Sequence, residues 1–207
     1  MNDVKRTIIT LTGIVQGVGF RPFVYRTACR LGLFGWVENQ GSKVIIDVEG
    51  PEENIRSFIC ALKNESPKNA EIAEFDMRAQ PFLGYTDFSI RASTVGVNTA
   101  NFLSGDIAVC ESCMKEFNAP GNKRYEYPFI CCTHCGPRYS IIKRLPYDRN
   151  NTTMVEFEMC PQCEVEYRSS GDRRFHAQTN CCPDCGPILK LLDARGNTVD
   201  SSDPAKM

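Results

Sequence analysis

"CESCMKEFNAPGNKRYEYPFICCTHC", residues 110–135, returns in altered form as "CPQCEVEYRSSGDRRFHAQTNCCPDC" at residues 160–185. Each copy opens with a Cys-x-x-Cys pair, runs for 18 residues and closes with a second Cys-x-x-Cys pair. The copies are offset by 50 residues, and the same offset places "GNKRY" at 121–125 over "GDRRF" at 171–175. Self-similarity at a fixed period is typical of tandem duplication. The second half of the chain is therefore expected to fold as two small, related units.

Eight of the twelve cysteines follow this pattern, and its spacing predicts two structural zinc sites. Two sulfurs of one Cys-x-x-Cys turn can reach a tetrahedral Zn²⁺ at roughly 2.3 Å, and a second pair closes the site. Four thiolates leave no position for a catalytic water, and zinc supplies folding free energy on the order of 10 kcal/mol to units too small for a large core. The predicted ligands are Cys110, Cys113, Cys132 and Cys135 in the first unit and Cys160, Cys163, Cys182 and Cys185 in the second.

The sequence leaves the pairing of these cysteine pairs open. Each unit can hold its own zinc, which is the simpler arrangement, or the pairs can be crossed between units. Cys131 and Cys181 fall outside the spacing rule and are predicted to be free thiols, while His134 and His176 are predicted to be surface or partly packed residues without a metal role. A dithiol redox switch is an alternative interpretation, but four motifs in duplicate register exceed what a switch requires.

Composition and charge exclude several classes of partner. The formal net charge is -1 and no basic stripe is present, which argues against a nucleic-acid partner. The N-terminus lacks the layout of a secretory signal, and no apolar run approaches the roughly 18 residues of a membrane helix. We expect a soluble cytoplasmic protein with no membrane partner, in which clustered thiols hold metal rather than form disulfides.

The first half of the chain is predicted to have an α+β fold of the ferredoxin-like βαββαβ type. Strands are expected at 6–15, 35–40, 42–50 and 70–78, helices at 21–33 and from Pro51 onward, and an extra edge strand at 86–92. The expected product is an antiparallel sheet covered by two helices on one face. Cys29 and Cys60 are predicted to be small, partly buried side chains on these helices.

A glycine-containing loop, "GIVQGVGFRPFVYR" at 13–26, joins the first strand to the first helix. Gly17 and Gly19 permit backbone conformations that turn successive N–H groups inward, and the helix N-terminus adds its positive end. Arg21 can bind the same anion through its guanidinium. The loop lacks both the Walker pattern and a complete GxGxxG motif, so it predicts a phosphate site that is not a typical nucleotide loop.

"GIVQGVGFRPFV" followed by "GWVENQGSKVIIDVEG" resembles the acylphosphatase family. The resemblance implies hydrolysis of an acyl phosphate without metal. Asn39 is implied to position the attacking water, although a purely structural role beside the turn "QGS" stays open for it. The residues implied to hold the phosphoryl group are Gln16, Gly17, Val18, Gly19, Phe20 and Arg21.

Both halves together are similar to the HypF family of hydrogenase-maturation carbamoyltransferases, through "PFICCTHCGPRYSI", "PYDRNNTTM", "CPQCEVEY" and "DRRFHAQTNCCPDCGP". The resemblance implies that this chain matches the N-terminal part of such a protein. In that family carbamoyl phosphate and ATP serve to carbamoylate the C-terminal cysteine of a HypE-type acceptor, and the ATP-dependent steps are implied to use domains that this chain lacks. The first domain is implied to cleave carbamoyl phosphate.

The resemblance and the composition together divide the chain into four segments. We expect an acylphosphatase-like domain at 1–91, a linker at 92–105, a tandem zinc domain at 106–195 and a polar tail at 196–207. A second hypothesis treats the chain as a non-catalytic docking module, in which the zinc units bind partner domains and the glycine loop merely binds anions.

Overall fold

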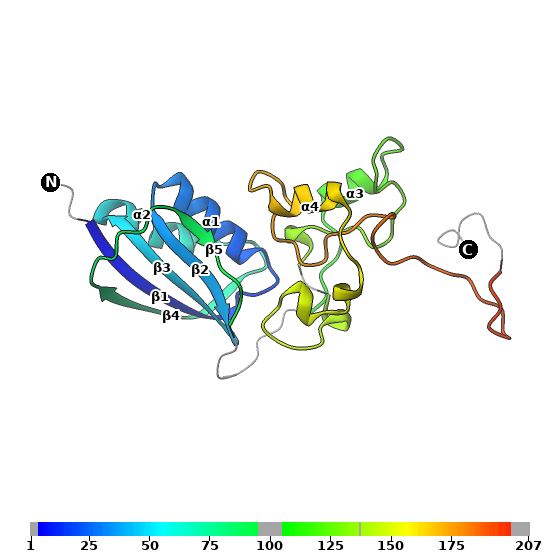
Figure 1. The fold of residues 1–207 in the computed structure, drawn as a ribbon, viewed down its shortest axis with the longest axis horizontal. Coiled ribbons are helices and arrows are strands. Elements are labelled where there is room, and N and C mark those ends of the chain that lie inside the picture. The colour runs from blue at the N-terminus through cyan, green and yellow to red at the C-terminus, as the bar shows by residue number, and fades with distance from the viewer. Residues whose placement is uncertain (1–3, 95–104, 137, 200–207) are drawn as a thin grey trace.

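In the computed structural model, the described residues are 4–94, 105–136 and 138–199. The chain forms two neighbouring parts, a sheet with two long helices and a second part with short helices and irregular loops (Figure 1). No helix within the described ranges combines the length and the apolar character that crossing a membrane requires.

The first part is a five-stranded sheet with the strand order β4-β1-β3-β2-β5. The ferredoxin-like α+β prediction is confirmed, because the elements follow in the order βαββαβ before the extra strand β5. Their bounds are β1 Val4–Ile14, α1 Phe20–Arg30, β2 Phe34–Gln40, β3 Lys43–Pro51, α2 Glu52–Asn64, β4 Glu71–Gln80 and β5 Phe88–Ile90.

The expectation of a wholly antiparallel sheet is wrong for the edge strand β5, which pairs parallel to β2. The other neighbouring pairs are antiparallel. Strand β4 is one outer strand of the sheet, and its C-terminal end lies level with the N-terminal end of β2. The chain then crosses to the other outer position, beside β2, and therefore runs through β5 in the same direction as β2.

One apolar cluster joins the helices to the sheet. Alternate residues of the strands point toward α1 and α2, as the period of two requires. Val44, Ile46 and Val48 of β3 are fully buried, and they share the cluster with Val24 of α1 and Phe58 of α2. The remaining buried members include Ile9, Leu11, Phe20, Val37 and Leu62.

The alternation of apolar and polar residues in β3 predicts Asp47 and Glu49 on an exposed face, yet both are buried. The carboxylate of Glu49 accepts hydrogen bonds from the N–H groups of Leu83, Gly84 and Tyr85. Asp47 accepts from the Arg6 guanidinium at 2.6 and 2.9 Å. The segment after β4 thus covers this face of the sheet, and it is the segment that carries the chain to β5.

The interpretation of Cys29 and Cys60 needs correction, because both are exposed. They do lie on α1 and α2, as predicted. Each occupies the side of its helix that faces away from the sheet, where burial is not required.

The second part repeats its backbone as the duplication predicts. Helix α3, Glu111–Phe117, and helix α4, Pro161–Arg168, each begin directly after the first cysteine of a unit. Glu126 and His176 occupy equivalent positions, and both have φ of 53°, an uncommon value for residues other than glycine. Four short 3-10 helices complete this part: η1 Thr133–Cys135, η2 Tyr139–Ile141, η3 Arg149–Asn151 and η4 Thr153–Glu156.

Candidate phosphate site and zinc centres

The glycine loop lies between the end of β1 and the start of α1, as predicted. Gly17 and Gly19 have φ of 75° and 78°, which are left-handed conformations that glycine adopts without strain. Within the described part of the chain, the N–H groups of Gly17, Val18 and Gly19 donate no hydrogen bond. With the N-terminus of α1 following directly, these groups are available to an anion.

Arg21 is buried at the start of α1, and its side chain is already engaged. Its Nη1 donates to Ser93 Oγ at 3.1 Å, and its Nη2 donates to the carbonyl of Tyr147 at 3.3 Å. Nη2 also forms an ion pair with Asp148 Oδ1 at 2.6 Å. The cysteine-rich part therefore contacts the residue to which the sequence assigned phosphate binding, and sequence reasoning missed this contact.

Asn39 lies in β2 with only 1% of its surface exposed. Neither polar atom of its side chain has a hydrogen-bond partner among the described residues. Burying an unpartnered amide costs about 1–3 kcal/mol, so such a group commonly marks a bound water or ligand. Gln16 differs, because its amide is committed to the carbonyls of Gly41 and Lys43.

A small cavity of about 30 Å³ lies between the glycine loop and the cysteine-rich part. This volume exceeds the roughly 10–15 Å³ that a water molecule needs, so the cavity has room for water. Its walls include Thr133, Tyr147 and Gln178 from the second part, facing Gly19 and Arg21 from the first. The candidate phosphate site is therefore roofed by the cysteine-rich part.

His176 also lines this cavity. Burial lowers its pKa to about 4, and the positive charge of Arg21 acts in the same direction. Its ring packs against Tyr167 and Phe175, in agreement with the prediction of a partly packed histidine. His134, by contrast, is exposed.

The eight predicted metal ligands form two clusters, and each cluster comes from one unit. The sulfurs of each cluster lie within 4.8 Å of one another. Neighbouring Sγ atoms are 3.5 to 3.9 Å apart in the first cluster and 3.7 to 3.8 Å in the second. A tetrahedral Zn²⁺ with bonds of roughly 2.3 Å requires sulfur separations of about 3.8 Å, so both clusters fit zinc.

The structure thus groups the ligands locally, and the crossed pairing does not occur in it. Cys131 and Cys181 are buried outside the two clusters. The sulfur of Cys181 lies 3.5 Å from the hydroxyl oxygen of Tyr127.

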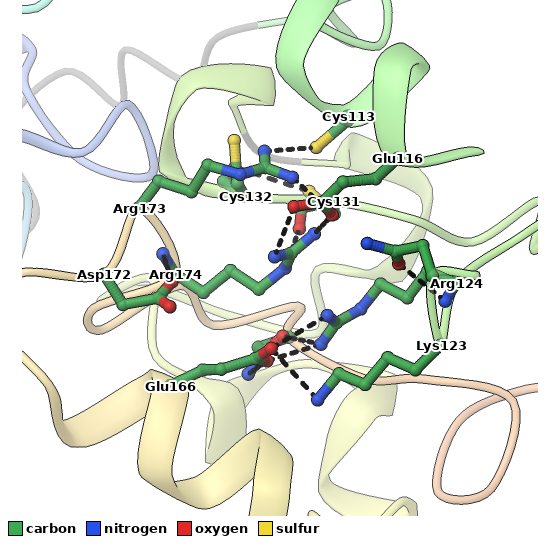
Figure 2. Close-up of polar contacts among 12 residues, drawn as sticks. Cys113, Glu116, Lys123, Arg124, Cys131, Cys132, Glu166, Asp172, Arg173 and Arg174 are labelled. Atoms are coloured by element: carbon green, nitrogen blue, oxygen red, sulfur yellow. Dashed lines mark hydrogen bonds and ion pairs between the residues drawn. The ribbon is translucent and has the colours of Figure 1, made fainter. Parts of the chain in front are cut away.

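Each cluster is contacted by basic residues of the other unit. Figure 2 shows this for the first cluster, where Arg173 reaches Cys113. Arg173 of the second unit donates to Cys113 Sγ at 2.8 Å, and Arg124 of the first donates to Cys163 Sγ at 3.3 Å. A site with four thiolates and one divalent ion has a net negative charge, so these cations offset it. The carboxylates that bind the same cations are Glu116 for Arg173 and Arg174, and Glu166 for Lys123 and Arg124.

Comparison with known proteins identifies a known family for each part of the chain. The acylphosphatase family model matches residues 7–90, and the HypF finger model matches residues 109–142 and 159–192. An acylphosphatase of Clostridium beijerinckii is 42% identical over 81 residues, which are 38% of this chain and 89% of that protein. The carbamoyltransferase HypF2 of Cupriavidus necator is 49% identical over 203 residues, which are 96% of this chain and 25% of that protein.

A crystal structure of full-length HypF in a phosphate- and nucleotide-bound form superposes with a TM-score of 0.86 at 43% identity, covering 93% of this chain and 26% of that one. The fold and the two sites define an acylphosphatase-type domain joined to a tandem four-cysteine finger. The chain belongs to the HypF family of carbamoyltransferases. It spans about a quarter of the length of these HypF relatives.

Proposed function

We propose that residues 1–91 hydrolyse acyl phosphates and that carbamoyl phosphate is the substrate. The activity would serve a carbamoyltransferase that matures nickel-iron hydrogenase. In this proposal carbamoyl phosphate and ATP are used to carbamoylate the C-terminal cysteine of a HypE-type acceptor. The ATP-dependent and transfer steps would use regions of the longer relatives, of which this chain spans about a quarter.

The chemistry needs positioning and charge neutralisation more than it needs a reactive side chain. The loop from Gln16 to Phe20 and the guanidinium of Arg21 would hold the phosphoryl group. Asn39 would orient a water whose oxygen bonds to phosphorus while the bond from phosphorus to the bridging oxygen breaks. Carbamate leaves with the electron pair of that bond, and the proton of the water passes to the phosphate product.

The single observation that carries this proposal is the amide of Asn39. It is buried and unpartnered among the described residues, in a domain that matches the acylphosphatase model. A purely structural asparagine at a turn would bond the neighbouring backbone or face solvent. An amide held ready for a water explains why the unfavourable burial is tolerated.

We further propose that the two cysteine clusters hold structural zinc. Four sulfurs fill the coordination shell of each ion, so zinc would take no part in the hydrolysis. The division at residues 91, 105 and 195 and the location in the cytoplasm stay predictions.

A second candidate function, the docking module, is favoured by the contact between Arg21 and Asp148. This ion pair at 2.6 Å gives the arginine of the loop a partner within the protein. In that case the loop would join the two parts of the molecule, and the exposed remainder of the cysteine-rich part would bind neighbouring domains.

Release of phosphate from carbamoyl phosphate by the zinc-loaded chain tests the first proposal. We expect release by the unmodified chain, and a fall in kcat of at least about a hundredfold in Arg21→Ala and in Asn39→Ala, because each would remove a group that the proposal assigns to the reacting phosphoryl or its water. Arg78→Ala, which removes an exposed arginine of β4, is the matched control.

The two candidate functions give opposite results. If the unmodified chain releases no phosphate while zinc is bound and the substrate stays intact, the proposal of hydrolysis is wrong and the docking-module hypothesis is favoured. Equal loss of activity in Arg78→Ala would also contradict the assigned site.

A further inference from the structure

Resting on the proposed function, we propose that Asp148 competes with the phosphate for Arg21 and thereby sets the affinity of the loop for its anion. Asp148 belongs to the cysteine-rich part, 127 positions along the chain from Arg21. The side chains of the pair are 10% and 25% exposed, so the contact is largely shielded from solvent.

The hydrogen bonds of Arg21 show why the two anions compete. A guanidinium offers paired donors along two edges, and the terminal nitrogen Nη2 belongs to both edges. Nη2, which has two hydrogens, already donates to two acceptors, the carbonyl of Tyr147 and Asp148. A phosphate that binds through two parallel N–H groups must therefore displace one of these acceptors. Asp148 is the acceptor whose negative charge also repels phosphate.

The backbone on both sides of Asp148 is fixed, so the carboxylate does not leave by a movement of the whole loop. The N–H of Tyr147 donates to Gln16 Oε1 at 3.1 Å, and the N–H of Arg149 donates to Gln178 Oε1 at 2.8 Å. The Arg149 guanidinium donates to three backbone carbonyls, those of Phe157, Gln178 and Asn180. Competition at Arg21 is then decided by the Asp148 side chain alone.

This arrangement has a direct consequence for turnover. The inorganic phosphate that hydrolysis would produce is the anion that the glycine loop and Arg21 bind most readily, and a tightly held product would block the site. A carboxylate beside the guanidinium weakens that binding and returns to Arg21 when phosphate leaves. The cysteine-rich part thus supplies a residue that determines the affinity of a site in the other part.

Binding of inorganic phosphate to the zinc-loaded chain, measured by calorimetry, tests the proposal. Asp148→Asn should bind phosphate about tenfold more tightly than the unmodified chain, equivalent to ~1.4 kcal/mol. Asp148→Ser is a second neutral variant in case the first folds poorly, and Asp148→Glu, which keeps the charge, should stay within about twofold of the unmodified chain. Glu156→Gln removes an equal charge from an exposed position and is the matched control.

Adding Arg21→Ala to Asp148→Asn should abolish the gain, which places the effect at this pair. The proposal is overturned if both neutral variants, with circular dichroism and zinc content unchanged, bind phosphate equally or more weakly. If the chain hydrolyses carbamoyl phosphate but the neutral variants bind phosphate no more tightly, the competition is rejected and the proposed function is kept. If the neutral variants bind phosphate more tightly but no variant hydrolyses carbamoyl phosphate, the competition is kept and the proposed function is rejected.

Discussion

The two cysteine units of the molecule, 110–135 and 160–185, have equivalent arginines, and each arginine binds groups of the other unit. Arg124 binds Glu166 and donates to the carbonyl of Cys181 at 2.7 Å. Its equivalent Arg174 binds Glu116 and donates to the carbonyl of Cys131 at 3.1 Å. The units are therefore joined reciprocally, and the arginine of each unit pairs with a carboxylate of the other.

The two units differ in the basic residue that precedes these arginines. In the second unit it is Arg173, which reaches both Glu116 and the sulfur of Cys113. In the first unit it is Lys123, whose ammonium lies 3.7 Å from the sulfur of Cys163, farther than Arg124 at 3.3 Å. A planar guanidinium can serve two acceptors at once, whereas an ammonium acts as a compact charge. Arg124 therefore donates both to a cluster sulfur and to a backbone carbonyl of the other unit. In the second unit Arg173 makes the sulfur contact and Arg174 makes the carbonyl contact.

The units also differ in what they face. Residues 132, 133 and 136 of the first unit and 176–179 of the second line the cavity over the glycine loop. The equivalent residues, 182, 183 and 186 and 126–129, lie outside that cavity. Duplication was thus retained in the contacts that hold the units together and was modified on the surface that faces the other part of the chain.

The largest expected effect comes from breaking one cluster. Cys163→Ser should lose both zinc ions rather than one, because collapse of the second unit also withdraws Arg173 and Arg174 from the first. Loss of structural zinc removes stabilisation on the order of 10 kcal/mol. Zinc content by mass spectrometry and unfolding by circular dichroism measure it. Cys60→Ser, an exposed cysteine outside the clusters, should keep both ions; loss of only one ion in Cys163→Ser would contradict the coupling.

A smaller effect separates the tasks of the equivalent arginines. Arg124→Met and Arg174→Met should each destabilise the chain by roughly 2–3 kcal/mol, because each removes charge-assisted hydrogen bonds from a part-buried carboxylate that keeps one other cation. Only Arg124→Met should also speed metal release from its neighbouring cluster, since Arg174 does not donate to a sulfur among the described contacts.

Urea unfolding and cadmium NMR, in which each four-sulfur site gives its own resonance, measure these two effects. Arg168→Met, which changes an exposed arginine of α4, is the control. Equal metal release from both arginine variants would show that the sulfur contact of Arg124 has no effect.

The smallest effect concerns His176, whose equivalent in the first unit is Glu126. The pKa of His176 is lowered to about 4, below its unfolded value of about 6.5. As the pH falls from 6.5 to 5, the unfolded chain binds a proton that the folded chain does not, so the folded state loses about 2 kcal/mol. His176→Gln should remove this part of the pH dependence of the free energy of unfolding. His134→Gln, at an exposed position, should leave it in place; a drop of equal size in both variants would be inconsistent with burial of His176 as its cause.

The sequence was sufficient for the features that depend on local spacing. The cysteine frame, the order of strands and helices and the glycine loop all follow from periods and intervals along the chain. Contacts between distant segments could not be predicted in this way. Asp148 carries no pattern that connects it to Arg21, and the alternation in β3 placed Glu49 in solvent because the covering segment after β4 is irregular. The sequence did contain one indication of the contacts between the units, because "GNKRY" and "GDRRF" repeat a pair of basic residues at the same offset as the cysteines.

The reciprocal joining of the units also has a consequence for synthesis of the protein. A ribosome releases the chain from its N-terminus at about 5–20 residues per second. The first four-cysteine cluster is therefore complete before Arg173 and Arg174 have been made, and it has to wait for its cations. Newly made thiolates remain exposed in that interval to metal exchange and to mispairing with the second set. Zinc supplied while the last 50 residues of the tandem repeat are translated should therefore protect the first cluster from these errors.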